Sequence, residues 1–364
     1  MKIKTITCHD VYNVGASLQA YALVEYLRNL GHQVEIIDYK PLYLQHYQLT
    51  GVANPRYDKP VLREIYQLLK LPGRIVDRKS RRKKSFDIFT EKYLPRTSKT
   101  YSSIDELKAD TPEADIYIAG SDQIWNPLFQ NGKDPSFFLQ FAPNSSKRIS
   151  YAASFAVDAL TAEDSGRMKE WLKSLNAISV REKSGVQLLS KMGLHGVQVC
   201  DPVFLLERTA WEKLAICPQD KKYLLVYDFD NNPEIRKIAS ELAKKRDLRT
   251  ISVFPMEGAD GIYKDMGPLE FVGTVLNADT VLSNSFHATA FSLMFQKDFF
   301  VVNRNENINT RMQDLLESVG LSARLIRRCS DNIDYITAAE WKRVERLLVK
   351  IIEKSKQFLD GVMN

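Results

Sequence analysis

The sequence has 364 residues, of which 44% are hydrophobic and 26% are charged, and these proportions are typical of a globular protein. The length exceeds the size at which one hydrophobic core keeps growing, so two domains are expected. A net charge of +6 is a mild excess for this length and does not support nucleic-acid binding, and no run approaches the roughly 18 apolar residues of a membrane span.

The first residues predict a strand, a helix and a second strand. Residues 2–8 alternate in the manner of a strand, and a polar turn over 9–16 leads to a helix that begins at Ser17 and ends at Gly31. Residues 33–38 predict the second strand. Such a βαβ unit joins parallel strands, so we expect a parallel sheet with ligands bound beyond the carboxyl ends of its strands.

The polar turn of this unit holds two candidate ligand-binding residues, Asn13 and Gly15. Both lie at the edge of the predicted sheet where ligands bind. A competing explanation for Gly15 is structural, because glycine permits a left-handed turn. The turn has neither a GxGxxG nor a Walker pattern, so it gives only weak support for a nucleotide.

A strongly basic run covers residues 74–84, RIVDRKSRRKK, with seven basic residues against one acid. Runs of this kind are usually solvated helix faces or mobile loops. The alternative is that this basic loop attracts an anionic surface such as lipid headgroups or a diphosphate-linked acceptor.

Residues 115–119 predict a buried strand that ends in a cluster of small and hydrogen-bonding residues. The candidates for binding a sugar are Gly120, Ser121, Asp122, Gln123 and Trp125. We expect Ser121 and Asp122 to bind sugar hydroxyls, and Trp125 to stack on a sugar face. The competing explanation is an Asx-type turn with Trp125 in the core.

Another predicted strand, residues 177–180, ends in Arg181 and Glu182. Arg181 therefore also faces the edge where ligands bind. A guanidinium there can hold a phosphate or a carboxylate in bidentate fashion. A salt bridge to Glu182 or another acid is the competing explanation.

A second series of strands and helices begins at Tyr223 and contains the most informative stretch, ADTVLSNSFHATAFSLMF. Residues 280–282 predict a strand, Asn284 and Ser285 break it, and a helix begins near His287. The free amides of a new helix suit an anion, and imidazole can give or take a proton near neutral pH. The competing explanation is that Ser285 merely caps the helix and His287 is a surface residue.

We divide the chain into an N-terminal α/β domain over 1–205, a C-terminal Rossmann-like domain over 206–336, and an amphipathic helix over 337–364 that packs back across both. Arg311 opens a helix of the second domain and either reaches the cleft between the domains or lies on the surface.

The four cysteines are far apart and form no metal-ligand pattern. We therefore expect a cytoplasmic protein that binds no metal or organic cofactor.

Seven segments, in this order, resemble the polysaccharide pyruvyl transferase family over nearly the full length. They are NVGASLQAYAL, LGHQVEIIDYKP, AGSDQIWNP, RISYAASF, ISVRE, CDPVFLL and SNSFHATAFSLMF. The resemblance implies an α/β fold with two Rossmann-like domains facing across a cleft, similar to the glycosyltransferase B architecture. It also implies transfer of pyruvyl from phosphoenolpyruvate to two sugar hydroxyls, giving a ketal, in cell-surface or exopolysaccharide biosynthesis.

Carried over residue by residue, the family's histidine falls on His287, as general acid or base, and its arginine before an acid falls on Arg181, which would hold the phosphoenolpyruvate anion. Asn13, Gly15 and the turn before His287 would complete the donor site. Family members tend to carry an arginine two positions before the histidine, where this chain has Ser285. Arg311 or the amides around Gly15 would then replace it.

The acceptor implied by the resemblance is a sugar or a lipid-linked oligosaccharide. The basic run over 74–84 would give peripheral contact with an anionic membrane at the inner face. Two alternatives stay open. A nucleotide-sugar glycosyltransferase of the same architecture would bind a nucleoside diphosphate in the second domain. A non-catalytic sugar-binding component of the same pathway would bind sugar without turnover.

Overall fold

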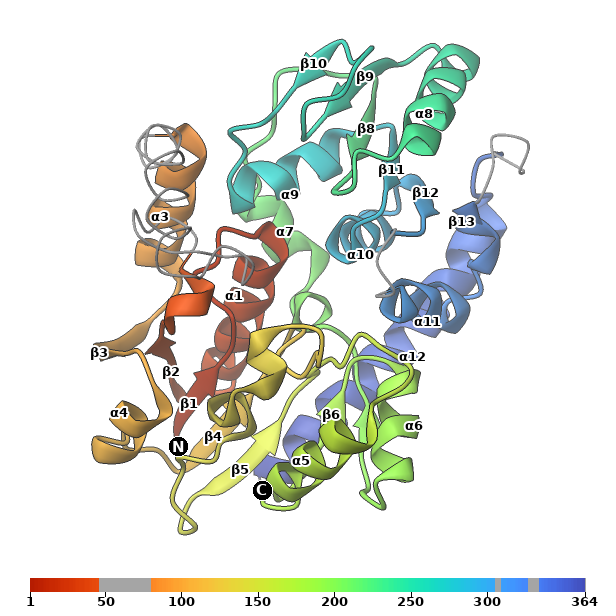
Figure 1. Cartoon of the computed structure of the whole chain (residues 1–364). Coiled ribbons are helices and arrows are strands. Elements are labelled where there is room, and N and C mark those ends of the chain that lie inside the picture. The colour runs from red at the N-terminus through yellow and green to blue at the C-terminus, as the bar shows by residue number, and fades with distance from the viewer. Residues whose placement is uncertain (46–79, 305–308, 327–333, 364) are drawn as a thin grey trace, which may run out of the picture.

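The computed structural model describes residues 1–45, 80–304, 309–326 and 334–363. Two parallel sheets dominate it, one built from the N-terminal half and one from the C-terminal half (Figure 1). The first sheet has the order β3-β2-β1-β4-β5. Its strands are β1 Lys2–Ile6, β2 Gln33–Tyr39, β3 Arg96–Tyr101, β4 Ile116–Ala119 and β5 Lys147–Ser150. A short parallel pair, β6 Ser179–Val180 and β7 Val197–Gln198, continues it through a bridge between Ile149 and Ala177.

The second sheet has the order β10-β9-β8-β11-β12-β13, and every pairing in it is parallel. Its strands are β8 Tyr223–Tyr227, β9 Arg249–Ser252, β10 Gly261–Ile262, β11 Thr280–Ser283, β12 Asp298–Val302 and β13 Leu325–Ile326. The central strands β8, β11 and β12 are buried along their whole length because helices cover both faces. The prediction of an α/β fold with two parallel sheets is therefore confirmed, while the boundary at residue 205 stays a prediction.

The helices lie on the faces of the sheets and between them (Figure 1). Those of the N-terminal half are α1 Val14–Asn29, α3 Arg81–Tyr93, α4 Ile104–Ala109, α5 Ala162–Leu172 and α6 Lys183–Lys191. Those that follow are α7 Arg208–Leu214, α8 Pro233–Arg246, α9 Pro268–Asn277, α10 Phe286–Met294, α11 Thr310–Ser318 and α12 Ala338–Met363. Short 3-10 turns are η1 Leu42–Leu44, η3 Gln130–Lys133, η4 Pro135–Phe138, η5 Pro202–Leu205 and η6 Ser322–Arg324.

Helix α1 begins at Val14, three residues before the predicted start at Ser17. Asn13 is its N-cap, and its side-chain oxygen accepts hydrogen bonds from the amides of Gly15 at 2.9 Å and Ala16 at 3.3 Å. An Asn cap of this kind satisfies amides that have no partner within the helix. The helix ends as predicted, with Gly31 at a positive φ of 87°.

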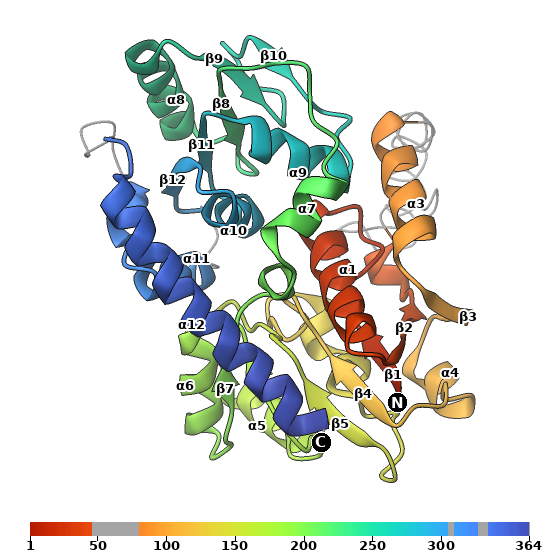
Figure 2. The ribbon, with the colours of Figure 1, turned by 180° about the vertical axis from the view of Figure 1, so that it is seen from behind.

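Helix α12 crosses the back of the molecule from the second sheet to the first (Figure 2). It begins with a capping box, in which Glu340 N–H donates to the Thr337 hydroxyl and Thr337 N–H donates to the Glu340 carboxylate. Further along, the Ser355 hydroxyl accepts from Cys200 N–H at 2.8 Å, and Lys147 donates to the carbonyl of Val362. Near its start, Arg343 donates to the Gly320 carbonyl at 2.9 Å, so the helix contacts both halves of the chain.

The basic run is described only from residue 80 onward, and residues 74–79 of the prediction lie outside the described residues. Residues 81–84 form the first turn of α3, so this part is a helix and not a loop. Arg82 donates to the carbonyls of Tyr12 at 2.8 Å and Met266 at 3.1 Å, which joins α3 to both halves. Among the described residues, no helix is long and apolar enough to cross a bilayer.

Candidate active site

His287 lies on the first turn of α10, directly after β11, as the strand-turn-helix prediction required. Ser285 caps this helix, because its hydroxyl accepts the Ala288 N–H at 3.4 Å. The imidazole is not a surface group: His287 is 7% exposed. The alternative of a surface histidine is therefore wrong, whereas the capping role given to Ser285 is confirmed.

The turn before His287 is held by hydrogen bonds within the sheet. Asn284 donates to the Asp228 carboxylate at 2.6 Å, and its side-chain oxygen accepts from Phe229 N–H at 3.0 Å. Ser285 N–H donates to the Ser283 hydroxyl at 2.8 Å. These bonds fix the turn that presents His287, while a direct contact of Asn284 or Ser285 with the donor stays a prediction.

A buried carboxylate joins His287 to Arg181. Asp201 Oδ2 lies 3.1 Å from Arg181 Nη1 and 3.5 Å from His287 Nε2. Burial by itself raises the pKa of Asp201. The charge of Arg181, followed by the interaction with His287, lowers this pKa by more than burial raises it, to about 2. Asp201 is therefore ionised, and it links a guanidinium of the N-terminal half to an imidazole of the C-terminal half.

Two arginines from different halves lie over the ring of Phe286. The Cζ atoms of Arg181 and Arg311 are 5.0 Å and 5.6 Å from its centroid. Asp122 Oδ1 lies 3.8 Å from Arg181 Nη2 and 3.7 Å from Arg311 Nη1. Burial, followed by the like charge of Arg181, lowers the pKa of Arg311 to about 10. The two cations are thus close enough to repel each other.

These side chains form one group at the carboxyl ends of the strands of both sheets. We call it the arginine–histidine cluster, and its members are Asp122, Arg181, Asp201, Phe286, His287 and Arg311. Among its buried nitrogens, Arg181 Nε and Arg311 Nε make no hydrogen bond to any described residue, whereas Arg181 Nη1 and His287 Nε2 face Asp201 Oδ2. Buried donors are normally satisfied, so the cluster is suited to an anion that accepts from them.

The N-terminus of α1 abuts the cluster at Gly15. A Cβ atom built on Gly15 would lie 2.0 Å from His287 Nδ1, so a side chain here would collide with the imidazole. Gly15 is inside α1 and not in a left-handed turn, so the structural explanation from φ is wrong. Because Asn13 already accepts the amides of Gly15 and Ala16, these amides do not supply the predicted anion contact.

The residues predicted to bind the sugar lie in different surroundings. Ser121 is fully buried, and its hydroxyl donates to the Ala152 carbonyl at 3.0 Å while accepting from Arg181 Nη2 at 2.5 Å. It therefore orients Arg181, and the prediction that it binds a sugar hydroxyl is wrong. Gly120 has a φ of +126°, and a Cβ there would lie 2.2 Å from the Tyr151 carbonyl oxygen, so this glycine is required by the backbone.

Trp125 was predicted to stack on a sugar, and the structure shows that this is wrong. Its indole is fully buried, donates to the Phe137 carbonyl at 2.9 Å and stacks on Phe138 at a centroid distance of 5.4 Å. Gln123 is half-buried, and its side-chain oxygen accepts from Asn126 at 2.8 Å. Of the predicted sugar-binding residues, Asp122 belongs to the cluster.

Sequence reasoning gave no role to two members of the cluster, Asp201 and Phe286. A signal for Asp201 existed, since it follows β7 closely and so lies at the edge that was used to select Arg181. Phe286 carried no signal, because an aromatic residue in the first turn of a buried helix is ordinary.

Glu182 is also buried, and one of its oxygens accepts the amides of Phe155 at 2.8 Å and Ala156 at 3.0 Å. Burial raises the pKa of Glu182.

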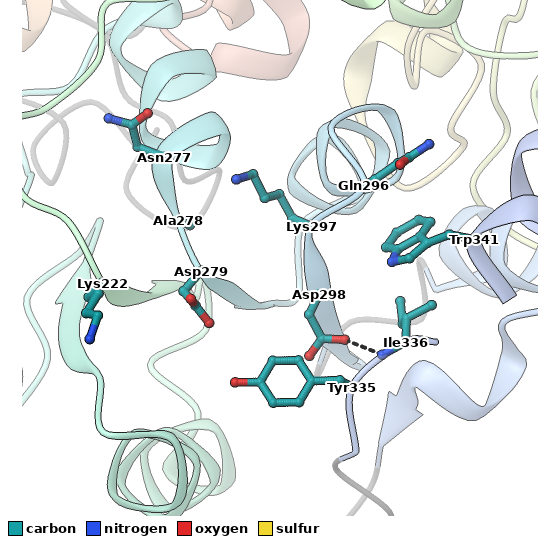
Figure 3. A pocket seen from close by; sticks show the side chains of 10 residues that line it. All are labelled: Lys222, Asn277, Ala278, Asp279, Gln296, Lys297, Asp298, Tyr335, Ile336 and Trp341. Carbon is teal, nitrogen blue, oxygen red and sulfur yellow. Dashed lines mark hydrogen bonds between the residues drawn. The ribbon is translucent and has the colours of Figure 1, made fainter. Parts of the chain in front are cut away.

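A cavity of about 400 Å³ lies at the opposite end of the second sheet, where β11 and β12 begin (Figure 3). Asp279, Lys297 and Trp341 are among the side chains that line it. It holds none of the cluster residues and faces the amino ends of these strands. Because ligands of open α/β sheets bind beyond the carboxyl ends, we do not assign the active site to this cavity.

Comparisons with known proteins identify the family and the fold of the chain. A family model described as polysaccharide pyruvyl transferase matches residues 13–306. No protein of curated function matches the chain. The chain is similar in fold to the solved structure of a UDP-N-acetylglucosamine 2-epimerase from Rickettsia bellii, with a TM-score of 0.51, 12% identity, and coverage of 100% of this chain and 98% of that one.

Two other solved structures are more distant. A UDP-GlcNAc 2-epimerase from Neisseria meningitidis bound to UDP-GlcNAc has a TM-score of 0.46, 13% identity, and coverage of 96% of this chain and 100% of that one. A heptosyltransferase from E. coli has a TM-score of 0.39, 11% identity, and coverage of 84% of this chain and 90% of that one. Together with the two parallel sheets, the likeness to the Rickettsia bellii structure confirms the predicted fold, two Rossmann-like domains similar to the glycosyltransferase B architecture.

Proposed function

The chain belongs to the polysaccharide pyruvyl transferase family, which is a family of transferases, and from this premise we propose that it transfers pyruvyl from phosphoenolpyruvate to two hydroxyls of a sugar. The observation that carries the proposal is the pair of buried guanidinium groups of Arg181 and Arg311, whose Nε atoms make no hydrogen bond to any described residue. Phosphoenolpyruvate has a phosphate and a carboxylate, and planar guanidinium groups bind both kinds of anion. An imidazole beside them provides the proton transfer that the reaction needs.

In the proposed reaction, His287 gives a proton to the methylene carbon of phosphoenolpyruvate, and a sugar hydroxyl oxygen bonds to the neighbouring carbon. The second hydroxyl oxygen bonds to the same carbon as the bond to phosphate breaks, which gives a ketal. Of the two hydroxyl protons, one replaces the proton that His287 supplied and the other leaves with phosphate. Arg181 and Arg311 stabilise the anions of the donor and the departing phosphate.

Arg311 is the candidate replacement for the arginine that this chain lacks at position 285. Family members tend to carry an arginine two positions before the histidine, and here Ser285 is an N-cap with no charge. Arg311 brings a guanidinium to Phe286, the residue between Ser285 and His287, from the first turn of α11. We propose that it supplies the second cation of the donor site, and that Asp122 holds it and Arg181 until the anion binds.

Alanine in place of Arg181 or Arg311 is expected to weaken phosphoenolpyruvate binding by about 10-fold to 150-fold, the equivalent of one hydrogen bond to a charged group. Calorimetric titration measures this without an acceptor, and thermal unfolding shows whether each variant is folded. Arg249 is a matched control, because its side chain is 57% exposed and pairs with Asp220 at the surface. Equal affinity in Arg181→Ala, Arg311→Ala and Arg249→Ala would contradict the proposed donor site.

The acceptor is proposed to be a sugar or a lipid-linked oligosaccharide of a cell-surface or exopolysaccharide pathway. The proposed reaction uses no metal, organic cofactor or nucleic acid. A cytoplasmic location and contact with an anionic membrane stay predictions.

The competing ligand is a uridine diphosphate compound, since the chain shares its fold with a UDP-N-acetylglucosamine 2-epimerase. That likeness concerns the fold, whereas the family match covers most of the sequence.

A further inference from the structure

A carboxylate of the C-terminal half caps a helix of the N-terminal half beside the arginine–histidine cluster. Asp314 Oδ2 accepts the backbone N–H groups of Lys183 at 2.7 Å and Ser184 at 3.4 Å, the first amides of α6. Glu182 is the N-cap of α6 but makes no side-chain capping bond, so Asp314 of α11 takes that place. A carboxylate at this end of a helix also interacts favourably with the helix dipole. Figure 1 shows α11 between α10 and α6.

The position of this contact ties it to the two arginines of the cluster. On α11, Arg311 and Asp314 are three residues apart, so they lie on the same face of the helix. On the other side, Lys183 follows Arg181 by two residues. A shift of α11 away from α6 would therefore separate the two guanidinium groups. The like charges of the two groups oppose their close arrangement, and Asp122, at 3.8 Å and 3.7 Å from them, offsets only part of that repulsion.

We propose that Asp314 is a positioning residue for the donor site, which holds Arg311 beside Arg181 before the substrate binds. The inference rests on the proposed function, and it assigns to Asp314 no contact with the donor. If the site already has its binding geometry, no binding free energy is spent on reorganisation. If the site must first close, the apparent affinity falls in proportion to the fraction of molecules that are closed.

The first experiment needs no ligand. Hydrogen exchange of the Lys183 and Ser184 amides is measured in the unchanged protein, Asp314→Ala, Asp314→Asn and Glu317→Ala. Glu317 is the control, since it is exposed on the same helix. We expect exchange at least tenfold faster in Asp314→Ala, a smaller increase in Asp314→Asn, which keeps an acceptor oxygen, and no change in Glu317→Ala. Equal exchange in all four proteins would overturn the inference.

The second experiment is titration of the same four proteins with phosphoenolpyruvate. We expect affinity at least fivefold lower in Asp314→Ala, an intermediate loss in Asp314→Asn and an unchanged value in Glu317→Ala. Unchanged affinity in both Asp314 variants would overturn the positioning role. If Asp314→Ala does not fold, Asp314→Asn decides both experiments. If the unchanged protein does not bind phosphoenolpyruvate, the proposed function fails, and the exchange data still decide whether Asp314 holds α11 against α6.

Discussion

Glutamine in place of His287 is expected to lower the rate of phosphate release from phosphoenolpyruvate by about a hundredfold to ten-thousandfold, the usual contribution of a positioned acid or base. Glutamine fills similar space but cannot transfer a proton. His287 Nε2 is buried and lies 3.5 Å from Oδ2 of the ionised Asp201. Arg181 and Arg311 remain, so phosphoenolpyruvate binding should change by no more than a few-fold.

The rate is measured with pyranosides that carry free 4- and 6-hydroxyl groups as acceptors. His195→Gln is the control, because His195 is an exposed histidine outside the cluster. A variant at His287 that keeps the full rate would show that another group transfers the proton. A variant that loses donor binding to the same extent as rate would show that His287 binds the anion instead.

Alanine in place of Gly15 should have the second large effect, although Gly15 bears no chemical group. The new Cβ would lie 2.0 Å from Nδ1 and 2.4 Å from Cε1 of His287, so either the imidazole or α1 has to move. Overpacking of this kind costs about 1 to 3 kcal/mol of stability. A displaced catalytic group commonly costs about a hundredfold in rate, and we expect at least this loss in Gly15→Ala.

Gly166→Ala is the matched control, since Gly166 is also inside a helix and a Cβ there meets no atom within 4 Å. It should keep full activity and unfold with a free energy about 0.5 to 1 kcal/mol higher, because alanine favours a helix over glycine. If Gly15→Ala were as active as Gly166→Ala, the close approach of α1 to His287 would not matter for the reaction.

The elements that could be predicted from the sequence are those whose pattern is set by burial. Strands β8 and β11 are continuous apolar runs in the interior of a parallel sheet; β8 begins at Tyr223, where the second series was predicted to begin, and β11 was predicted within one residue. Strand β3 was missed because it is a polar edge strand, RTSKTY, and β10 and β13 because each has two residues. The start of α1 was placed late, although Asn13 is a typical N-cap residue.

The candidate site was predicted in part. His287, Arg181 and Arg311 each come from a turn or helix start at the carboxyl edge of a sheet, which the sequence indicates, and the structure brings all three together. Which side chains accompany them depends on contacts between distant segments. Asp201 and Phe286 join the cluster through such contacts, which no local pattern encodes.

The same limit explains the errors at the predicted sugar-binding residues. Trp125 and Ser121 follow a strand at the binding edge, where exposed and buried side chains have the same sequence pattern. Trp125 is covered by Phe137 and Phe138, and Ser121 is closed off by Arg181 and Ala152. Burial at such positions is decided by packing across the fold.

The most direct test of the proposed donor site is a calorimetric titration of the unchanged protein with phosphoenolpyruvate, alongside a second titration with uridine diphosphate. The arrangement of Arg181, Arg311 and His287 predicts saturable binding of phosphoenolpyruvate and no binding of the nucleotide. Binding of uridine diphosphate with no response to phosphoenolpyruvate would contradict the account and favour a nucleotide-sugar transferase of the same fold.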